Sequence, residues 1–152
     1  MSVDFTEYRI KQNLAEAFRS KDARLARAGL QGLVRHRFPH LENRLALRLW
    51  ETAFAYGEVS RIGTAKREIW HAVRWGISRR DPVGVVAWLQ NWGKAHYCFE
   101  RLTEIGLSDM TCEGVIVEAP ERFPDDMVVA AERLIRPASS LVDRSERSAS
   151  ND

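Results

Sequence analysis

The sequence has few of the residues that build disulfide frameworks, zinc clusters or membrane spans. Its 152 residues include 2 cysteines and 4 histidines, and Cys98 and Cys112 have no closely spaced thiol or imidazole of the kind that zinc sites use. The longest apolar run, Val83 to Leu89, is too short to cross a bilayer. The opening MSVDFTEYRI lacks the basic head and apolar stretch of a secretion signal. These absences predict a cytoplasmic protein with no membrane partner and with reduced cysteines.

The sequence motifs of common enzymes are also missing. The chain has no Gly-rich phosphate loop, no Gly-x-Ser-x-Gly elbow and no dinucleotide fingerprint. Glu68 and His71 have the Glu-x-x-His spacing of a di-iron bundle, but such a site needs a second copy of the motif. His36 and His40 are separated by Pro39, which ends a helix there. We therefore expect no cofactor and no metal site, and the sequence favours a non-catalytic protein, although an active site can be assembled without local motifs.

Apolar residues recur at helical spacing through most of the chain. This pattern predicts an all-α fold, a single-domain helical bundle over residues 1–136 with five to six helices in short-loop hairpins. Gly57 and Gly106 are placed to stop helices, and Gly93 to kink one. The helices are expected at about 5–19, 22–38, 41–56, 64–78, 82–105 and 124–136, with 41–56 central because it has two apolar sides.

Two segments depart from the helical pattern. Val115, Ile116 and Val117 form a β-branched run, so 115–117 is expected to be a short strand or an extended crossing. Residues 137–152, with the sequence PASSLVDRSERSASND, are rich in serine and charge and poor in apolar residues. This composition predicts a disordered C-terminal tail.

Charge is distributed unevenly along the chain. Residues 1–80 hold 16 Lys and Arg against 8 Asp and Glu, or +8, and residues 81–152 hold 7 against 13, or −6, which sum to the net +2. A basic half can face nucleic acid, an acidic partner or the acidic half of a second copy. Folding can instead interleave the two halves and leave no charged patch.

The predicted helix over 64–78 carries the candidate binding residues. Arg67, His71 and Arg74 follow one another at spacings of four and three, which places them on one side of a helix, with Lys66 beside them. Such a basic stripe suits contact with an acidic protein surface or with phosphates. It is also what an ordinary solvated helix face looks like.

The segment from Glu58 to Trp75 can also be interpreted as a DNA-binding helix-turn-helix. Gly63 would be the turn glycine, with Ile62 and Ile69 as core positions. The basic residues of the second helix would then meet phosphates or base edges. Three features count against this hypothesis. Val59 occupies a position where a small residue is usual, and Gly57 leaves room for only a very short first helix. Helical turns with a central glycine are also common in proteins that bind no DNA.

The tryptophans allow two interpretations. They occur at helical spacing among Val, Leu and Ile, which favours packing in the core. One of them could be exposed as an anchor of an interface, because Trp and Arg are the preferred residues at binding hot spots. Stacking on nucleic-acid bases is the alternative. The residues concerned are Trp50, Trp70, Trp75, Trp88 and Trp92.

Taken together, these patterns favour a helical interaction module that binds an acidic protein surface or a second copy of itself. The alternative is a nucleic-acid-binding regulator that uses the same basic face. The binding residues expected in both cases are Lys66, Arg67, His71 and Arg74. Both hypotheses require this face to stay open to water, and not to be neutralised by the acidic half of the chain.

Overall fold

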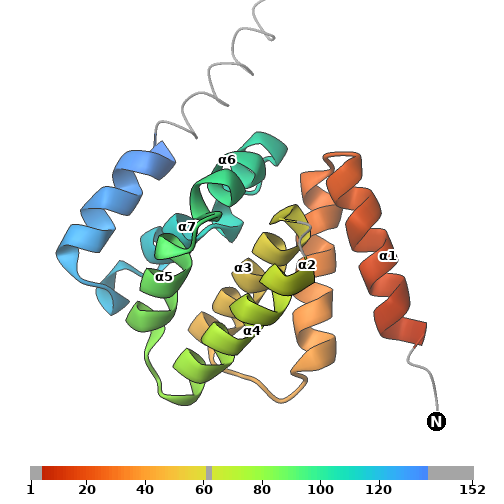
Figure 1. Ribbon diagram of the computed structural model, residues 1–152, viewed down its shortest axis with the longest axis horizontal. Helices are drawn as coiled ribbons and strands as arrows, with labels where there is room; N and C mark the ends of the chain where they lie inside the picture. Colours follow the sequence, from red (N-terminus) through yellow and green to blue (C-terminus); the bar gives the residue numbers. More distant parts are fainter. Residues whose placement is uncertain (1–4, 61–62, 137–152) are drawn as a thin grey trace, which may run out of the picture.

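The computed structural model describes residues 5–60 and 63–136, which form eight α-helices and two 3₁₀ helices and no strand (Figure 1). The labelled elements are α1 (Phe5–Arg19), α2 (Ala23–Arg37), α3 (Arg44–Ser60), α4 (Gly63–Ser78), α5 (Pro82–Asn91), α6 (Ala95–Ile105), η1 (Ser108–Met110), α7 (Cys112–Glu118) and η2 (Pro120–Arg122). The last helix covers residues 125–136. None of the helices in the described ranges is long and apolar enough to span a membrane. The tail predicted to be disordered, 137–152, lies outside those ranges.

The predicted all-α class is confirmed, but the predicted count of five to six helices is too low. One reason is that the segment expected as a single kinked helix forms two helices, α5 and α6, with a break around Gly93. A second reason is α7, which occupies the segment expected to be extended. The predicted stop at Gly57 is also wrong, because α3 continues to Ser60. Gly57 instead gives space to the stem of Lys66, whose Cγ would lie 3.2 Å from an added Cβ.

The run Val115–Val117 is helical because of its surroundings. The side chain of Thr111 accepts a hydrogen bond from the backbone N–H of Gly114, which caps the first turn of α7. Val115 and Ile116 are buried in the core from this helix. A strand would need a partner to complete its backbone hydrogen bonds, and the described residues contain none. Burial in a capped helix therefore overrides the β preference of these side chains.

Several predicted helix ends are confirmed by their capping contacts. The Asp22 side chain accepts from the N–H of Leu25 at the start of α2. Asp81 does the same for Gly84 at the start of α5, directly before Pro82. α6 ends at Gly106, whose φ of 95° lies in the left-handed region that glycine tolerates best.

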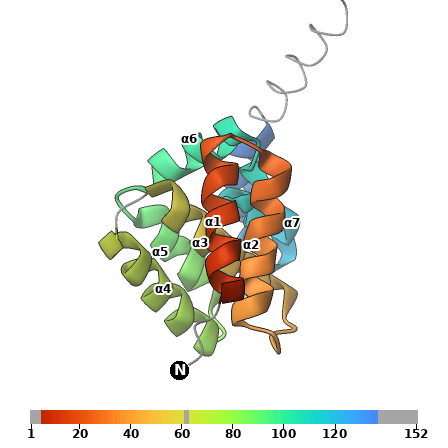
Figure 2. The same ribbon diagram turned by 90° about the vertical axis from the view of Figure 1, so that its right-hand side faces the viewer.

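Helix α3 is the centre of the molecule, as its two apolar sides predict. It contacts α2, α4, α5, α6 and α7, and its residues are buried along most of its length. Figure 2 shows α4 and α5 on one side of α3 and α7 on the opposite side. The molecule therefore has two separate regions in which side chains from different helices meet, one on each side of α3.

Candidate interaction face between α4 and α5

The structure brings together three of the four predicted binding residues. Arg67, His71 and Arg74 are exposed on the outer side of α4, and neither arginine forms an ion pair with a described carboxylate. Lys66 points elsewhere. It is half-buried, and its Nζ lies 3.4 Å from Oε1 of Glu58 at the end of α3. The basic stripe thus remains open, as both functional hypotheses require, but without Lys66.

Beside the stripe, α4 and α5 enclose a hollow of about 490 Å³. Close approach of the two helices forms its base, because a Cβ on Gly76 would lie 2.1 Å from Cγ2 of Val85. The tight turn through Asp81 and Pro82 brings α5 back along α4. The lining residues are Glu68, His71, Ala72, Trp75, Gly76, Asp81, Gly84, Val85 and Trp88.

Two tryptophans of this hollow are open to solvent. Trp75 is 59% exposed and Trp88 37% exposed, so the prediction of a buried position is wrong for both. It is confirmed for Trp50, which is buried, and Trp70 and Trp92 are partly buried against the core. The expectation of one exposed tryptophan falls short, because the structure has two facing the same hollow.

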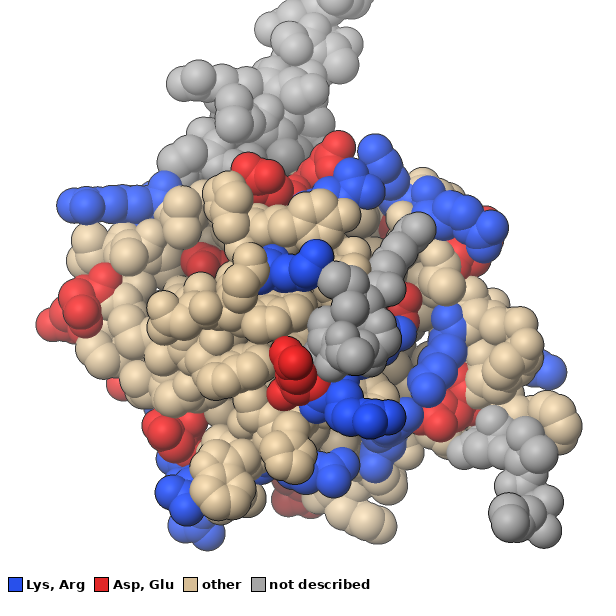
Figure 3. All heavy atoms as spheres, in the orientation of Figure 1, with Lys and Arg blue, Asp and Glu red and all other residues tan. Residues whose placement is uncertain are grey.

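The side chains of α4 follow a defined order around the helix. Arg67 and Arg74 lie outermost, His71 comes next, and Trp75 and Glu68 follow at the edge of the hollow, as 100° per residue requires. The guanidinium of Arg79 lies 4.0 Å from the ring centroid of Trp75, a cation–π contact that holds both side chains. In Figure 3, blue side chains gather at the lower centre, over α4, beside uncharged surface. We call this surface, formed by Arg67, His71, Arg74, Trp75 and Trp88, the α4–α5 face.

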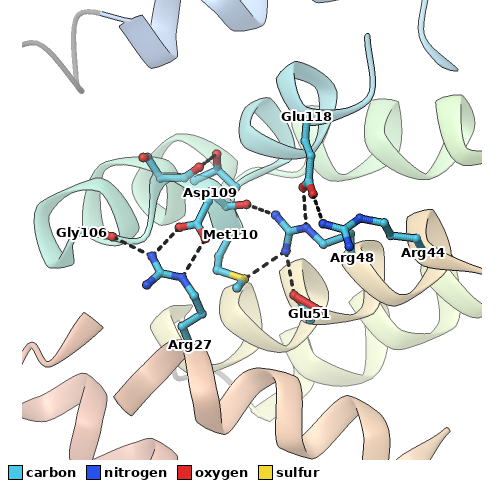
Figure 4. Close-up of polar contacts among 10 residues, drawn as sticks. Arg27, Arg44, Arg48, Glu51, Gly106, Asp109, Met110 and Glu118 are labelled. Carbon is cyan, nitrogen blue, oxygen red and sulfur yellow. Dashed lines mark hydrogen bonds and ion pairs between the residues drawn. The ribbon is translucent and has the colours of Figure 1, made fainter. Parts of the chain in front are cut away.

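The other side of α3 holds an arginine network that the sequence analysis did not anticipate (Figure 4). Its centre is Arg48, whose Nε lies 2.7 Å from Glu118 and whose Nη1 lies 2.8 Å from Glu51. The Nη2 of Arg48 donates to the backbone carbonyl of Asp109. These contacts tie α3 to α7 and to η1.

Two further arginines complete the network. Arg27 donates hydrogen bonds to both carboxylate oxygens of Asp109, each at 2.9 Å, and so joins α2 to η1. Arg44 donates to the second oxygen of Glu118 at 2.8 Å. A hollow of about 470 Å³ lies beside these residues. Since the three guanidinium groups already bind acceptors of the same chain, the network is suited to holding helices together.

The contacts of the network stabilise the charged forms of Arg27, Arg48 and Glu118. Burial alone would lower the pKa of Arg48, but hydrogen bonds and charges from Glu118 and Glu51 outweigh it and raise the pKa above its ordinary value. Burial would likewise raise the pKa of Glu118, and the hydrogen bonds and charges of Arg48 and Arg44 instead lower it. The hydrogen bond to Asp109 raises the pKa of Arg27.

The two cysteines are buried and carry no partner for nucleophilic chemistry. Burial raises the pKa of Cys98 to about 12 and that of Cys112 further still. Both contact Tyr56: the Sγ of Cys98 lies 3.8 Å from its carbonyl oxygen, and the N–H of Cys112 donates to its hydroxyl at 3.1 Å. Because a thiolate is the reactive form of cysteine, these residues act as small core side chains.

The remaining candidates for chemistry are not assembled into a site. Within the described ranges, no group of three His, Cys, Asp or Glu side chains could hold a metal ion. Glu68 and His71 lie on the exposed side of α4, at the rim of the hollow. One objection to the helix-turn-helix hypothesis, a very short first helix, does not hold, because α3 has 17 residues and continues through Gly57. Its core position Ile62 lies outside the described residues.

Comparison with known proteins adds no family to this description. Neither the protein-family models nor the curated proteins nor the solved structures contain a match to the chain. The molecule is therefore defined by its own geometry, as an all-α protein with one open arginine–tryptophan face and one closed arginine network.

Proposed function

We propose that this protein is a non-catalytic helical interaction module of the cytoplasm, and that its α4–α5 face binds an acidic protein surface. The proposal rests on the observation that the arginines of this face are exposed and form no ion pair within the described residues. Arg67 and Arg74 make no ion pair with any described carboxylate, whereas Arg27, Arg44 and Arg48 are all paired. Arginines left unpaired beside exposed tryptophans have the composition of a binding hot spot.

The hollow gives the face a place for an apolar anchor. Trp75 and Trp88 flank it, and Ala72 and Val85 supply further apolar lining. A partner side chain that enters this hollow would displace water from apolar surface, which stabilises a complex by about 25 cal/mol per Å² of area buried. The arginines at the rim would steer an acidic partner and set its orientation.

The carboxylates in the hollow favour a protein partner over nucleic acid. Glu68 and Asp81 both line it, and a phosphate placed there would meet their negative charges. A polypeptide can place an apolar side chain between them and direct its acidic residues outward to Arg67 and Arg74. Nucleic-acid binding by the same face remains the alternative because the tryptophans could stack on bases.

The test is capture from an extract of the source cells with three versions of the protein. Wild type is compared with Arg67→Glu/Arg74→Glu and with the control Arg9→Glu/Arg24→Glu, which makes the same change in charge at exposed positions of α1 and α2. We expect the same binding proteins with wild type and control, and their loss with the α4 variant. Equal capture by all three versions would exclude the α4–α5 face as the binding surface.

Titration with duplex and single-stranded DNA distinguishes the alternative. Contacts to phosphates would give an affinity that falls steeply with salt, by about one unit of log–log slope per phosphate neutralised. Absence of binding at low salt would eliminate nucleic acid as the partner. Salt-sensitive binding that Arg67→Glu/Arg74→Glu abolishes would replace the protein partner by nucleic acid.

A further inference from the structure

Ion pairs within the chain neutralise some of its charged side chains and leave others unpaired. Among residues 5–60 and 63–136, four ion pairs join the basic N-terminal half to the acidic C-terminal half: Lys21–Glu104, Arg27–Asp109, Arg44–Glu118 and Arg48–Glu118. Folding thus interleaves part of the two charge sets. What stays unpaired on each side shows where a second molecule could complete the neutralisation.

The unpaired acids gather at the start of the last helix. Glu121, Asp125 and Asp126 are exposed and form no ion pair within the described ranges. Figure 3 shows red side chains at the left edge, where helix 125–136 begins in Figure 1. Arg122 lies among them in sequence, but its side chain lines hollows beside the start of α3. Of the other unpaired acids in this half, Asp81 caps α5 and Glu113 is buried.

An exposed apolar side chain accompanies these acids. Val129 is 46% exposed, and it lies three and four residues after Asp126 and Asp125, so the three side chains share one side of the helix. The opposite side of the same helix is buried, with Ala131 in the core. The start of helix 125–136 therefore presents an apolar residue next to two carboxylates.

We propose that the occupant of the α4–α5 face is the start of helix 125–136 from a second copy of this chain, an inference that rests on the proposed function. Val129 of one copy enters the hollow between Trp75 and Trp88 of the next. Asp125 and Asp126 then meet Arg67 and Arg74. Each surface complements the other in charge and in its apolar centre.

This contact joins two different surfaces, so it is heterologous. In a joined pair, one copy keeps an unused helix end and the other an unused face, so association can continue into a ring or an open chain of molecules. A contact that depends on four charges also weakens with salt, because the Debye length falls from about 10 Å at 0.1 M to about 3 Å at 1 M.

Sedimentation velocity over a range of protein concentrations tests the proposal. We expect the mean mass of the wild type to rise with concentration at low salt, and to return toward the monomer at about 1 M salt. Arg67→Glu/Arg74→Glu removes one surface and Asp125→Lys/Asp126→Lys removes the other, so each variant alone should stay monomeric. Circular dichroism confirms that both variants fold.

One mixture and one fourfold variant make the assignment specific. Equal amounts of the two variants should associate as the wild type does, because the intact pair of surfaces and the charge-reversed pair each join one variant to the other. The chain with all four substitutions should associate again, since both charges are reversed together. A symmetric dimer through α4–α5 would give no such recovery, and that result would overturn the proposed contact.

The experiment separates this inference from the proposed function. A wild type that stays monomeric at low salt and at concentrations of several hundred micromolar, where even weak interfaces associate, would rule out the second copy as the occupant. Capture of a foreign protein that depends on Arg67 and Arg74 would then still support the function. A wild type that stays monomeric and captures no protein through Arg67 and Arg74 would exclude the α4–α5 face as a binding surface.

Discussion

Two groups of arginines differ in what surrounds them. One lies on α4, and the other joins α2 and α3 to η1 and α7; Figure 2 shows α4 and α7 on opposite sides of α3. Arg48 has a side chain 11% exposed, and its donors reach Glu51, Glu118 and a backbone carbonyl. Arg67 and Arg74 are exposed on α4, with no carboxylate of the described chain beside them. Arginine thus holds helices together in one region and remains exposed and available to a partner in the other.

This difference shows why the number of basic residues is a poor guide to a binding surface. Buried arginines that are fully paired have no donors left for a partner, and their removal leaves carboxylates without a counter-charge. Exposed arginines add little to stability and remain available. The comparison predicts that substitutions in the network change the free energy of unfolding, whereas substitutions on the α4–α5 face change binding.

The largest effect is expected from Arg48→Met. It leaves the buried Glu51 without its partner and removes the link to Glu118, which should lower the free energy of unfolding by about 3–5 kcal/mol. Urea unfolding followed by circular dichroism measures this change. Arg67→Met is the matched control and should change stability by less than about 0.5 kcal/mol. Similar effects of the two substitutions would abolish the distinction between the two regions.

A smaller loss should follow when the backbone that supports the network is pushed apart. A Cβ at position 114 would lie 2.4 Å from the carbonyl oxygen of Ser108 and 2.8 Å from Cα of Asp109. Gly114→Ala should therefore displace η1, which carries the acceptors for Arg27 and Arg48, and cost about 2–3 kcal/mol.

Gly32→Ala is the control for this substitution. The position on α2 has no atom within 4 Å of an added Cβ, so the better helix propensity of alanine should stabilise the protein by up to about 1 kcal/mol. The same urea unfolding experiment measures both glycine variants. A stabilising Gly114→Ala would show that η1 and α7 adjust to the added methyl group without cost.

On the α4–α5 face, Trp75→Ala should weaken binding and leave the free energy of unfolding almost unchanged. Truncating an exposed tryptophan that anchors an interface costs about 2 kcal/mol, or roughly 30-fold in Kd. Stability should change by less than about 1 kcal/mol, because the ring is 59% exposed and mainly contacts Arg79. Tyr97→Ala, an exposed aromatic on α6, is the control. Sedimentation velocity, or capture where the partner is foreign, measures the change.

The sequence predicted this fold where local signals and burial agree. The helix starts predicted at about 22 and 82 and the stop predicted at Gly106 agree with the structure, where Asp22 and Asp81 cap α2 and α5. It failed at 115–117, where the tertiary environment overrides a β-branched preference, and at Gly57, which serves close packing inside a helix. A glycine has the same sequence signal in both roles, so only the neighbouring element can distinguish them.

The candidate face was predicted in part for a similar reason. Spacing along one helix is sufficient to group Arg67, His71 and Arg74, and the structure agrees. Which tryptophans are exposed depends on how α5 packs against α4, which no local pattern specifies. The arginine network did leave one signal: Arg48 and Glu51 lie three residues apart in a segment predicted to be central, where charged residues must pair.

The smallest expected effect concerns acid. The folded-state pKa of Glu118 is below its ordinary value of 4.5, so the protonated form is disfavoured in the native state. Its stabilising contribution is therefore complete above pH 4.5 and is lost as the pH falls through the lowered pKa. Since the side chain is 36% exposed, we expect a contribution of no more than about 1 kcal/mol.

Urea unfolding of wild type and Glu118→Gln from neutral pH to about pH 3 measures this contribution. The difference in the free energy of unfolding between the two proteins should be constant at neutral pH and shrink in acid. A difference for Glu118→Gln that does not change with pH would mean that the carboxylate contributes packing and not charge, and Arg48 would then depend on Glu51 alone.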